Sequence, residues 1–164
     1  MKSFYQFVCI IIIMTSLFGC QQPQQTFTET EKDTIKKDVI NQFNELVYAL
    51  NEKNADLWFT NYSESEFISA IVGTDYYSTR TDFKDTITKY ISMREGQHVE
   101  PIEIRVTPLT PIIAFMTSEE KIEMLLKSGE NLNVKHVFTI IWRKEKASWK
   151  IIHSHESWME IEIQ

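Results

Sequence analysis

Hydrophobic positions along the chain follow two different spacings, one before Gly96 and one after it. Between about Thr34 and Lys53 they recur every three or four residues, which predicts one apolar face on an α-helix. A short helix is expected over 55–60, capped by Asn54, and a third helix is expected to begin at Thr81 and to end at Gly96 as its C-cap. The strands expected in this part are brief, at 67–72 and 76–78.

After Gly96 the apolar positions alternate with polar ones, which is typical of strands with one buried face. Pro108 and Pro111 interrupt the alternation, and a bulge is expected near Glu119-Glu120. Helices followed by an antiparallel meander predict an α+β fold, with helices packed on one face of a curved, mainly antiparallel sheet. The expected long strands are 98–107, 112–126, 132–143 and 148–158.

The first residues of the chain have the order of an export signal. Lys2 supplies a positive start, and Phe7–Phe18 is a nearly unbroken apolar run of 12 residues. A membrane-spanning helix needs about 20 such residues, so the run is too short to span and fits a cleavable signal peptide. It ends in Leu17-Phe18-Gly19-Cys20, which resembles the lipobox of bacterial lipoproteins. The alternative is an uncleaved anchor or a buried N-terminal helix.

The resemblance implies that Cys20 becomes the lipid-bearing N-terminus, attached to the membrane. We expect a signal peptide at 1–19, a polar tether at 20–30 and one domain at 31–164. Cys9 would leave with the signal and lipid would occupy Cys20, so no disulfide is expected. The expected location is the bacterial cell envelope, and the outer membrane in a Gram-negative source, because residue 21 is Gln rather than Asp.

The net charge of the mature chain argues against one class of partner. The net charge of the whole chain is −6, and removal of Lys2 with the signal makes it −7. An acidic balance argues against nucleic-acid binding, which needs a basic stripe. The aromatic content of 12% instead predicts a core or pocket rich in rings.

The end of the chain carries a motif that consists of Trp142, Arg143, Trp149, Ile151 or Ile152, His153, His155 and Ser157. This motif resembles the nuclear-transport-factor-2-like superfamily, closest to its SnoaL-like group and to the association domain of calmodulin-dependent kinase II. The resemblance covers about Glu31 to Trp158 and implies a cone-shaped α+β barrel, often dimeric through the convex sheet face, with a pocket between sheet and helices. It implies no single activity, because the fold hosts many.

Three histidines are the candidates for chemistry. His153 and His155 lie two residues apart on one strand, so they share a face, which we expect to be the concave face with Trp149. They are interpreted as ligand contacts, as acid–base groups and the best catalytic candidates, or as hydrogen-bonded members of a polar patch. A metal site is not expected, because a closed site needs more ligands than this pair and His136 supply. His136 itself either points into the pocket or packs among core aromatics, and no cofactor is expected.

Seven aromatic rings are expected around a ring-lined pocket for a small hydrophobic ligand, although each alone fits a core position better. A carboxylate base for an isomerase site could come from Asp75, Glu103 or Glu123, with Glu103 expected to face outward beside Arg105. Glu119 and Glu120 are interpreted as solvated strand edges, and His98 as solvated. The pocket rings named here are Trp58, Tyr62, Tyr76, Tyr90 and Trp142, with Phe67 and Trp158 near the opening.

Three functions remain open from the sequence. The first is a lipid-anchored module that binds a small ligand or a partner, favoured because no complete catalytic set is visible. The second is a SnoaL-like lyase or isomerase acting on a small hydrophobic carbonyl compound through His153 and His155. The third is a module for homodimerisation or for docking another envelope protein, whose convex contact face would consist of Val137, Thr139, Ile141 and Ile152.

Overall fold

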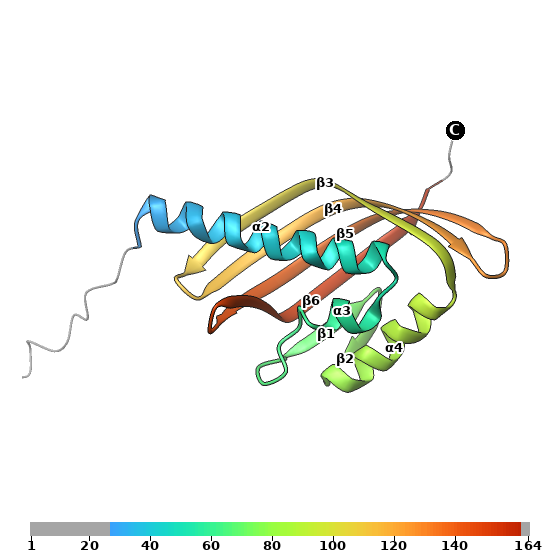
Figure 1. Cartoon of the computed structure of the whole chain (residues 1–164), viewed down its shortest axis with the longest axis horizontal. Helices are drawn as coiled ribbons and strands as arrows, with labels where there is room; N and C mark the ends of the chain where they lie inside the picture. Colours follow the sequence, from blue (N-terminus) through green and yellow to red (C-terminus); the bar gives the residue numbers. More distant parts are fainter. Residues whose placement is uncertain (1–26, 162–164) are drawn as a thin grey trace, which may run out of the picture.

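The computed structural model of the protein describes residues 27–161 (Figure 1). Within them the helices are α2 (Glu29–Asn51), α3 (Ala55–Phe59) and α4 (Arg80–Ser92). The strands are β1 (Ser69–Val72), β2 (Asp75–Tyr77), β3 (Arg94–Thr110), β4 (Ile113–Leu126), β5 (Asn131–Glu145) and β6 (Ser148–Glu160).

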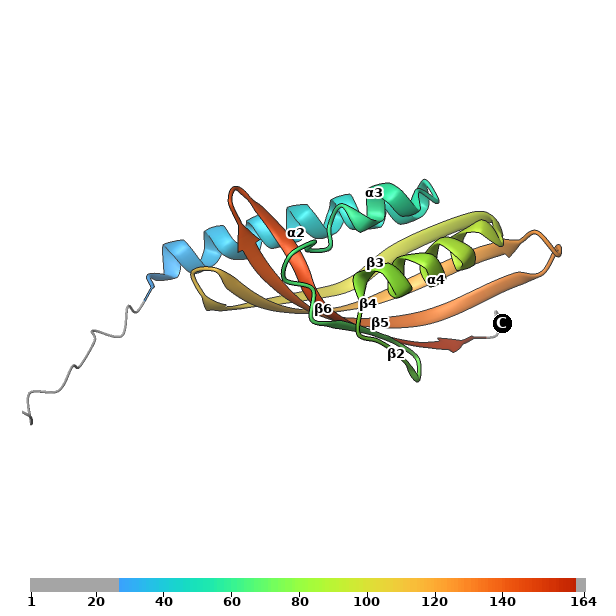
Figure 2. The same cartoon turned by 90° about the horizontal axis from the view of Figure 1, so that it is seen from below.

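The six strands form one sheet in the order β2-β1-β6-β5-β4-β3. All neighbouring strands are antiparallel except β1 and β6, which are parallel. The helices lie on one side of the curved sheet, as Figures 1 and 2 show from two directions. The predicted α+β fold of three helices on a curved, mainly antiparallel sheet is therefore confirmed. The covered side of the sheet is called the inner face below, and the opposite side the outer face.

Helix α2 begins at Glu29, ahead of the expected start at Thr34. A capping box explains the earlier start: the Thr28 side chain accepts from the Glu31 backbone N–H, and the Glu31 carboxylate accepts from the Thr28 backbone N–H. The apolar spacing that predicted the helix places its buried side against the sheet. That side consists of Ile35, Val39, Phe43, Leu46, Val47 and Ala49.

Two of the expected helix ends are wrong by a few residues. Thr79, rather than Thr81, caps α4, because its hydroxyl accepts from the Asp82 backbone N–H at 3.1 Å. Helix α4 ends at Ser92 with Met93 as its C-cap, and Gly96 lies inside β3 rather than at a helix end. The Asn54 cap of α3 is confirmed, since its side chain accepts from Leu57 N at 2.9 Å.

A group of aromatic rings fills the space between α3, α4 and the sheet. Trp58, Phe59, Tyr62 and Phe83 pack with ring centroids between 4.9 and 5.6 Å apart, mostly edge-on or tilted. All four side chains are buried, so this group belongs to the hydrophobic core. It holds α3 and α4 against the inner face and thereby fixes the end of the cone where the polar residues described next are found.

Two bulges decide which side chains of the long strands face inward. Opposite Glu120 and Glu119 the pairing of β3 jumps from Pro101 to Glu103, so the bulge expected near those glutamates lies on the neighbouring strand. In β6 the pairing jumps between Ile151 and His153, which leaves Ile152 as the extra residue. An extra residue reverses the inward–outward alternation of everything that follows it.

None of the helices within residues 27–161 is both long enough and apolar enough to cross a membrane. The expected signal peptide, lipobox and Cys20 lie outside the described residues.

Candidate functional site

A row of polar side chains interrupts the apolar inner face of β4, β5 and β6. Glu120 on β4 lies directly opposite His136 on β5, and Glu156 on β6 lies opposite Phe138, one inward position from His136. Met116 and Phe138 on the same face are buried, so these strands deliver the polar groups into the core. Ser118, Glu120, His136 and Glu156 are called the interior polar cluster below.

The four side chains are connected by short contacts. The Ser118 hydroxyl donates to Glu120 Oε1 at 2.7 Å. His136 Nδ1 lies 2.8 Å from Glu120 Oε2, and His136 Nε2 lies 3.5 Å from Glu156 Oε2. Both ring nitrogens of His136 therefore face a carboxylate, which suits the doubly protonated imidazolium.

The two carboxylates determine the charge of His136. Burial by itself lowers the histidine pKa, but the hydrogen bonds and charges of Glu120 and Glu156 together outweigh burial and raise the pKa to about 9. The ring is consequently a cation at neutral pH. A buried cation between two carboxylates is a proton donor rather than a free base.

One oxygen of the cluster has no partner. Glu156 Oε1 is buried and forms no hydrogen bond within the described residues, although the Glu156 side chain is 14% exposed. Glu120, in contrast, is only 1% exposed and has both oxygens engaged. Buried acceptors without partners are rare in proteins and call for an explanation.

The charge of Glu156 affects the pKa of two further side chains. Tyr62 donates its hydroxyl to Ser154 Oγ at 3.2 Å, and burial, with the Glu156 charge as a smaller cause, raises the tyrosine pKa well above its usual value. Burial lowers the pKa of Arg94, and the charge of Glu156 opposes that effect. The cluster is therefore flanked by a neutral phenol on one side and a largely buried guanidinium on another.

Arg94, whose pKa responds to the charge of Glu156, also lines a hollow of about 370 Å³ at the ends of α2 and α4. The hollow lies where α2 and α4 meet the start of β3 and the end of β4. Its lining consists of Glu52, Lys53, Ala55, Thr88, Ile91, Ser92, Arg94, Glu95 and Lys127.

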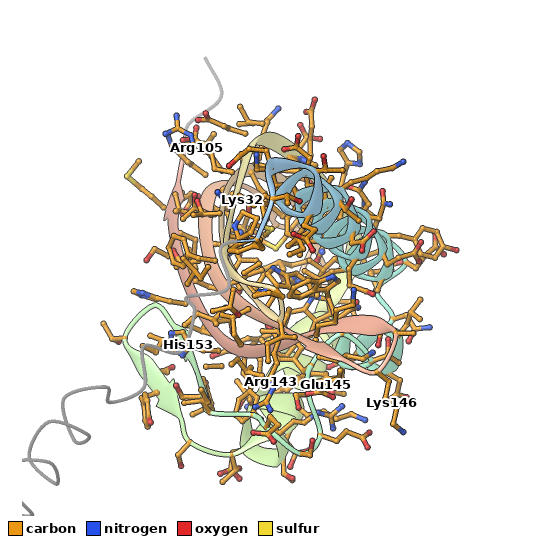
Figure 3. The ribbon with its side chains drawn as sticks, turned by 90° about the vertical axis from the view of Figure 1, so that its left-hand side faces the viewer. Lys32, Arg105, Arg143, Glu145, Lys146 and His153 are labelled. Carbon is orange, nitrogen blue, oxygen red and sulfur yellow. The ribbon has the colours of Figure 1, made fainter. Side chains whose placement is uncertain are left out.

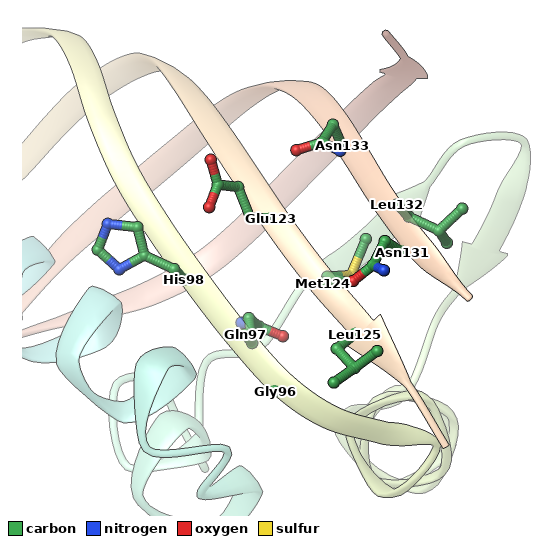
Figure 4. A pocket seen from close by; sticks show the side chains of 9 residues that line it. All are labelled: Gly96, Gln97, His98, Glu123, Met124, Leu125, Asn131, Leu132 and Asn133. Carbon is green, nitrogen blue, oxygen red and sulfur yellow. The ribbon is translucent and has the colours of Figure 1, made fainter. Parts of the chain in front are cut away.

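A second hollow, of about 570 Å³, lies at the end of the sheet near the β4–β5 turn (Figure 4). His98 and Glu123 are cross-strand partners there and are exposed, which agrees with the solvated His98 that was expected. They alternate with buried Val99 and lie on the outer face, so this hollow is separate from the interior polar cluster. Within residues 27–161 no group of three or more His, Cys, Asp or Glu side chains could hold a metal ion.

The prediction that His153 and His155 face the interior beside Trp149 is wrong. The extra residue Ile152 reverses the alternation, so His153 pairs with Ile141 and His155 with Thr139 on the outer face. His153 Nδ1 lies 2.9 Å from the Ser69 hydroxyl, and His155 is exposed. His153 is labelled in Figure 3, which looks along the molecule from the end where α2 begins. Burial is the main cause that lowers the His153 pKa, and the neighbouring His155 lowers it further.

The interpretation of Glu120 as a solvated strand edge is also wrong, because Glu120 is buried and bonded to His136. Glu119 does face outward, where it pairs with Lys135 at 2.9 Å. A signal for Glu120 was present in the alternation itself. Ser118 and Glu120 continue the series of buried Ala114 and Met116 at every second residue, which predicts the inner face.

The remaining candidates divide between core and surface. Trp58, Tyr62 and Trp142 are buried, whereas Tyr76 and Tyr90 are exposed. Glu103 faces outward and binds Arg105 at 2.7 Å, as expected. The other candidate carboxylates are also exposed: Asp75 on β2, and Glu123, which pairs with Lys121 at 2.7 Å. Trp158, the cross-strand partner of His136, is 60% exposed beside the cluster.

Comparisons with known proteins give a family and a fold. The model of the SnoaL-like domain matches residues 39–162. A candidate scytalone dehydratase from Novosphingobium aromaticivorans superposes with a TM-score of 0.72 at 10% identity, over 82% of this chain and 93% of that one. A hexachlorocyclohexane dehydrochlorinase from Novosphingobium barchaimii has a TM-score of 0.67 at 7% identity, over 82% and 94%.

A nuclear transport factor 2-like protein from Salmonella enterica superposes with a TM-score of 0.69 at 13% identity, over 76% of this chain and 91% of that one. Identities this low show the fold alone. No curated protein matches the chain by sequence.

Proposed function

The chain belongs to the SnoaL-like family of the nuclear-transport-factor-2-like superfamily, and on that premise we propose that it binds a small ligand inside its cone, against the interior polar cluster. The predicted resemblance to the SnoaL-like group is confirmed over residues 39–162. The similarity of the last strand to the association domain of calmodulin-dependent kinase II stays a prediction.

The observation that carries the proposal is the buried Oε1 of Glu156. A carboxylate oxygen withdrawn from water without a donor is costly, at about 1–3 kcal/mol or more for a charged group. A ligand that donates a hydrogen bond to this oxygen removes the cost. We therefore expect the ligand to carry a hydroxyl or amine group.

The surroundings of Glu156 define the rest of the ligand. Phe138 on β5 lies opposite Glu156, and Trp158 is exposed on the same face. Arg94 lines the hollow of about 370 Å³, and the charge of Glu156 affects its pKa, so that hollow is the proposed entrance. A pocket with an apolar wall and few convergent polar groups is typical of small-ligand sites.

We further propose that the protein works from the bacterial envelope, held by a lipid on Cys20. The support is the order of positive residue, apolar run, small residue and cysteine over residues 2–20.

Native mass spectrometry of the purified full chain tests the ligand proposal. Wild-type protein should retain a small molecule, or should acquire one from a library of hydroxyl- and amine-bearing compounds. The Glu156→Gln variant should lose binding by roughly tenfold or more, because its amide presents a donor where the ligand also donates.

Glu160→Gln is the matched control, since Glu160 lies on the same strand and is exposed. Equal binding by both variants, or no bound compound across the library, would contradict the proposal.

A second candidate function is a lyase that removes water from a β-hydroxy carbonyl compound. It is favoured by one observation, the oriented pair of His136 and Glu120 with Glu156 on the other side of the ring. Because His136 is protonated at neutral pH, the base would be Glu156 and the acid His136.

In that reaction Glu156 takes a proton from the carbon beside the carbonyl while the C–O bond of the hydroxyl breaks and a C=C bond forms. His136 gives its Nε2 proton to the departing hydroxide, which leaves as water. The proton on Glu156 then returns to His136 across the 3.5 Å separation, and both groups are restored.

Incubation with a panel of β-hydroxy ketones tests this candidate through the ultraviolet absorbance of the conjugated product. Wild type should form product, His136→Asn should not, and His153→Asn should match wild type. Turnover that survives in His136→Asn would exclude this mechanism.

The predicted homodimer stays a proposal with altered residues. Ile152 is buried by the bulge and does not belong to the outer face. Val137 is partly exposed there and stays in the proposed contact, while Phe115 and Met159, which are also exposed on that face, replace Ile152. Light scattering at high protein concentration should give twice the monomer mass.

A further inference from the structure

Three segments that are distant in the sequence meet at one end of the molecule. Helix α2 begins there, the β3–β4 turn lies close to its first residues in Figures 1 and 2, and the β5–β6 turn lies at the same end of the sheet. The backbone N–H of Lys144 donates to the carbonyl of Ile112 at 2.8 Å, which joins the two turns. Phe27, the first described residue, therefore lies at this end.

The β3–β4 turn exposes apolar side chains at its tip. Leu109 is 54% exposed and Ile112 is 51% exposed, and Pro108 and Pro111 flank them. Proline fixes the backbone locally, so the turn presents the two side chains in a defined position. Moving these two exposed aliphatic side chains out of water would be favourable in free energy.

The β5–β6 turn adds positive charge beside this tip. Lys144 and Lys146 form no ion pair within residues 27–161, whereas Lys32 and Arg143 at the same end are paired with Glu29 and Glu66 (Figure 3). Glu145 lies between the two lysines and accepts a hydrogen bond from the Ser63 hydroxyl, so residues 144–147 carry a net charge of +1. Aliphatic tips beside lysines match the boundary between lipid tails and anionic headgroups.

The length of chain between Cys20 and the domain limits which end of the domain can reach the bilayer. Six residues lie between Cys20 and Phe27 along the sequence, and this stretch spans at most about 25 Å when extended. Helix α2 has 23 residues, or about 35 Å, so the opposite end of the molecule lies beyond that reach.

We propose that this end of the domain rests on a lipid bilayer, with Leu109 and Ile112 inserted at the headgroup boundary and Lys144 and Lys146 against the phosphates. The proposal rests on the proposed lipid at Cys20. It orients the molecule, because the β4–β5 turn and the hollow beside Arg94 then face away from the membrane.

Single-cysteine variants of the full chain test the orientation. Leu109→Cys, Ile112→Cys and the matched control Ser128→Cys, on the exposed β4–β5 turn, are produced in a lipoprotein-processing bacterium and labelled with an environment-sensitive fluorophore. Each is reconstituted in vesicles of phosphatidylethanolamine and phosphatidylglycerol. We expect blue-shifted emission and quenching by spin-labelled lipid at 109 and 112, and neither at 128. Emission at 109 and 112 that matches 128 would overturn the orientation.

Wild-type protein, carrying no added cysteine, separates this failure from failure of the anchor. When lipid occupies Cys20 the wild type takes up no label; labelled wild type would overturn the anchor and the orientation with it. A label at Lys146→Cys gives a second measurement. Its quenching should fall when Leu109 and Ile112 are both changed to serine, and unchanged quenching would contradict insertion of these two side chains.

Discussion

The two faces of the β5–β6 pair each carry a histidine, and they shift its pKa in opposite directions. On the inner face His136 is 5% exposed and lies between two carboxylates that raise its pKa to about 9. On the outer face His153 shares a hydrogen bond with a neutral hydroxyl, and its pKa is lowered. The same residue type is thus a cation inside and a neutral ring outside at physiological pH. The two carboxylates outweigh the effect of burial on the pKa of His136, whereas burial is the main cause that lowers the pKa of His153.

The largest effect should come from removing the inner histidine. His136→Ala leaves Glu120 and Glu156 buried without their cation, which should lower the free energy of unfolding by about 3–5 kcal/mol. His153→Ala, the matched control on the outer face, should cost no more than about 1 kcal/mol. Urea denaturation measures both. Equal losses would remove the distinction between the faces.

The next effect should appear as a dependence of stability on pH. His136 has a higher pKa in the folded chain, about 9, than the ordinary value of 6.5, so its protonation stabilises the fold. The contribution is complete below pH 6.5 and disappears as the pH rises to about 9, a loss on the order of 3 kcal/mol. Urea denaturation between pH 6 and about 9.5 should show this decline in wild type and not in His136→Gln. A decline of the same size in His136→Gln would assign it to another group.

The smallest effect on stability should come from removing the neutral hydroxyl of Tyr62 on the inner face. Tyr62→Phe removes the hydrogen bond to Ser154 and should lower the free energy of unfolding by about 1 kcal/mol. Tyr48→Phe is the control, because Tyr48 is exposed on α2. Thermal or urea unfolding distinguishes them. A loss near that of His136→Ala would show that the hydroxyl is coupled to the ionised cluster.

The predictable part of this molecule was its local periodicity. Helix α2 and the four long strands follow from spacing, since apolar residues recur at a regular interval along each of them. The sequence did not predict which face His153 and His155 occupy, because Ile152 forms a bulge where β6 pairs with β5. No residue type in Trp149–His155 marks that bulge. Glu120 was missed because its charge was given more weight than its position in the alternation. Its partner lies 16 residues away on the next strand.

The parallel contact between β1 and β6 has a consequence for how the molecule assembles. Ser69 and His153 are 84 positions apart, and the Tyr62–Ser154 bond spans 92. Contacts of such long separation close late in folding, because the intervening chain must be ordered first. Strand β1 has no neighbour except β2 until β6 arrives, and β6 also brings Glu156 to His136. A chain that ends before Ser148 would therefore contain the histidine and its first carboxylate without the partner that completes the cluster.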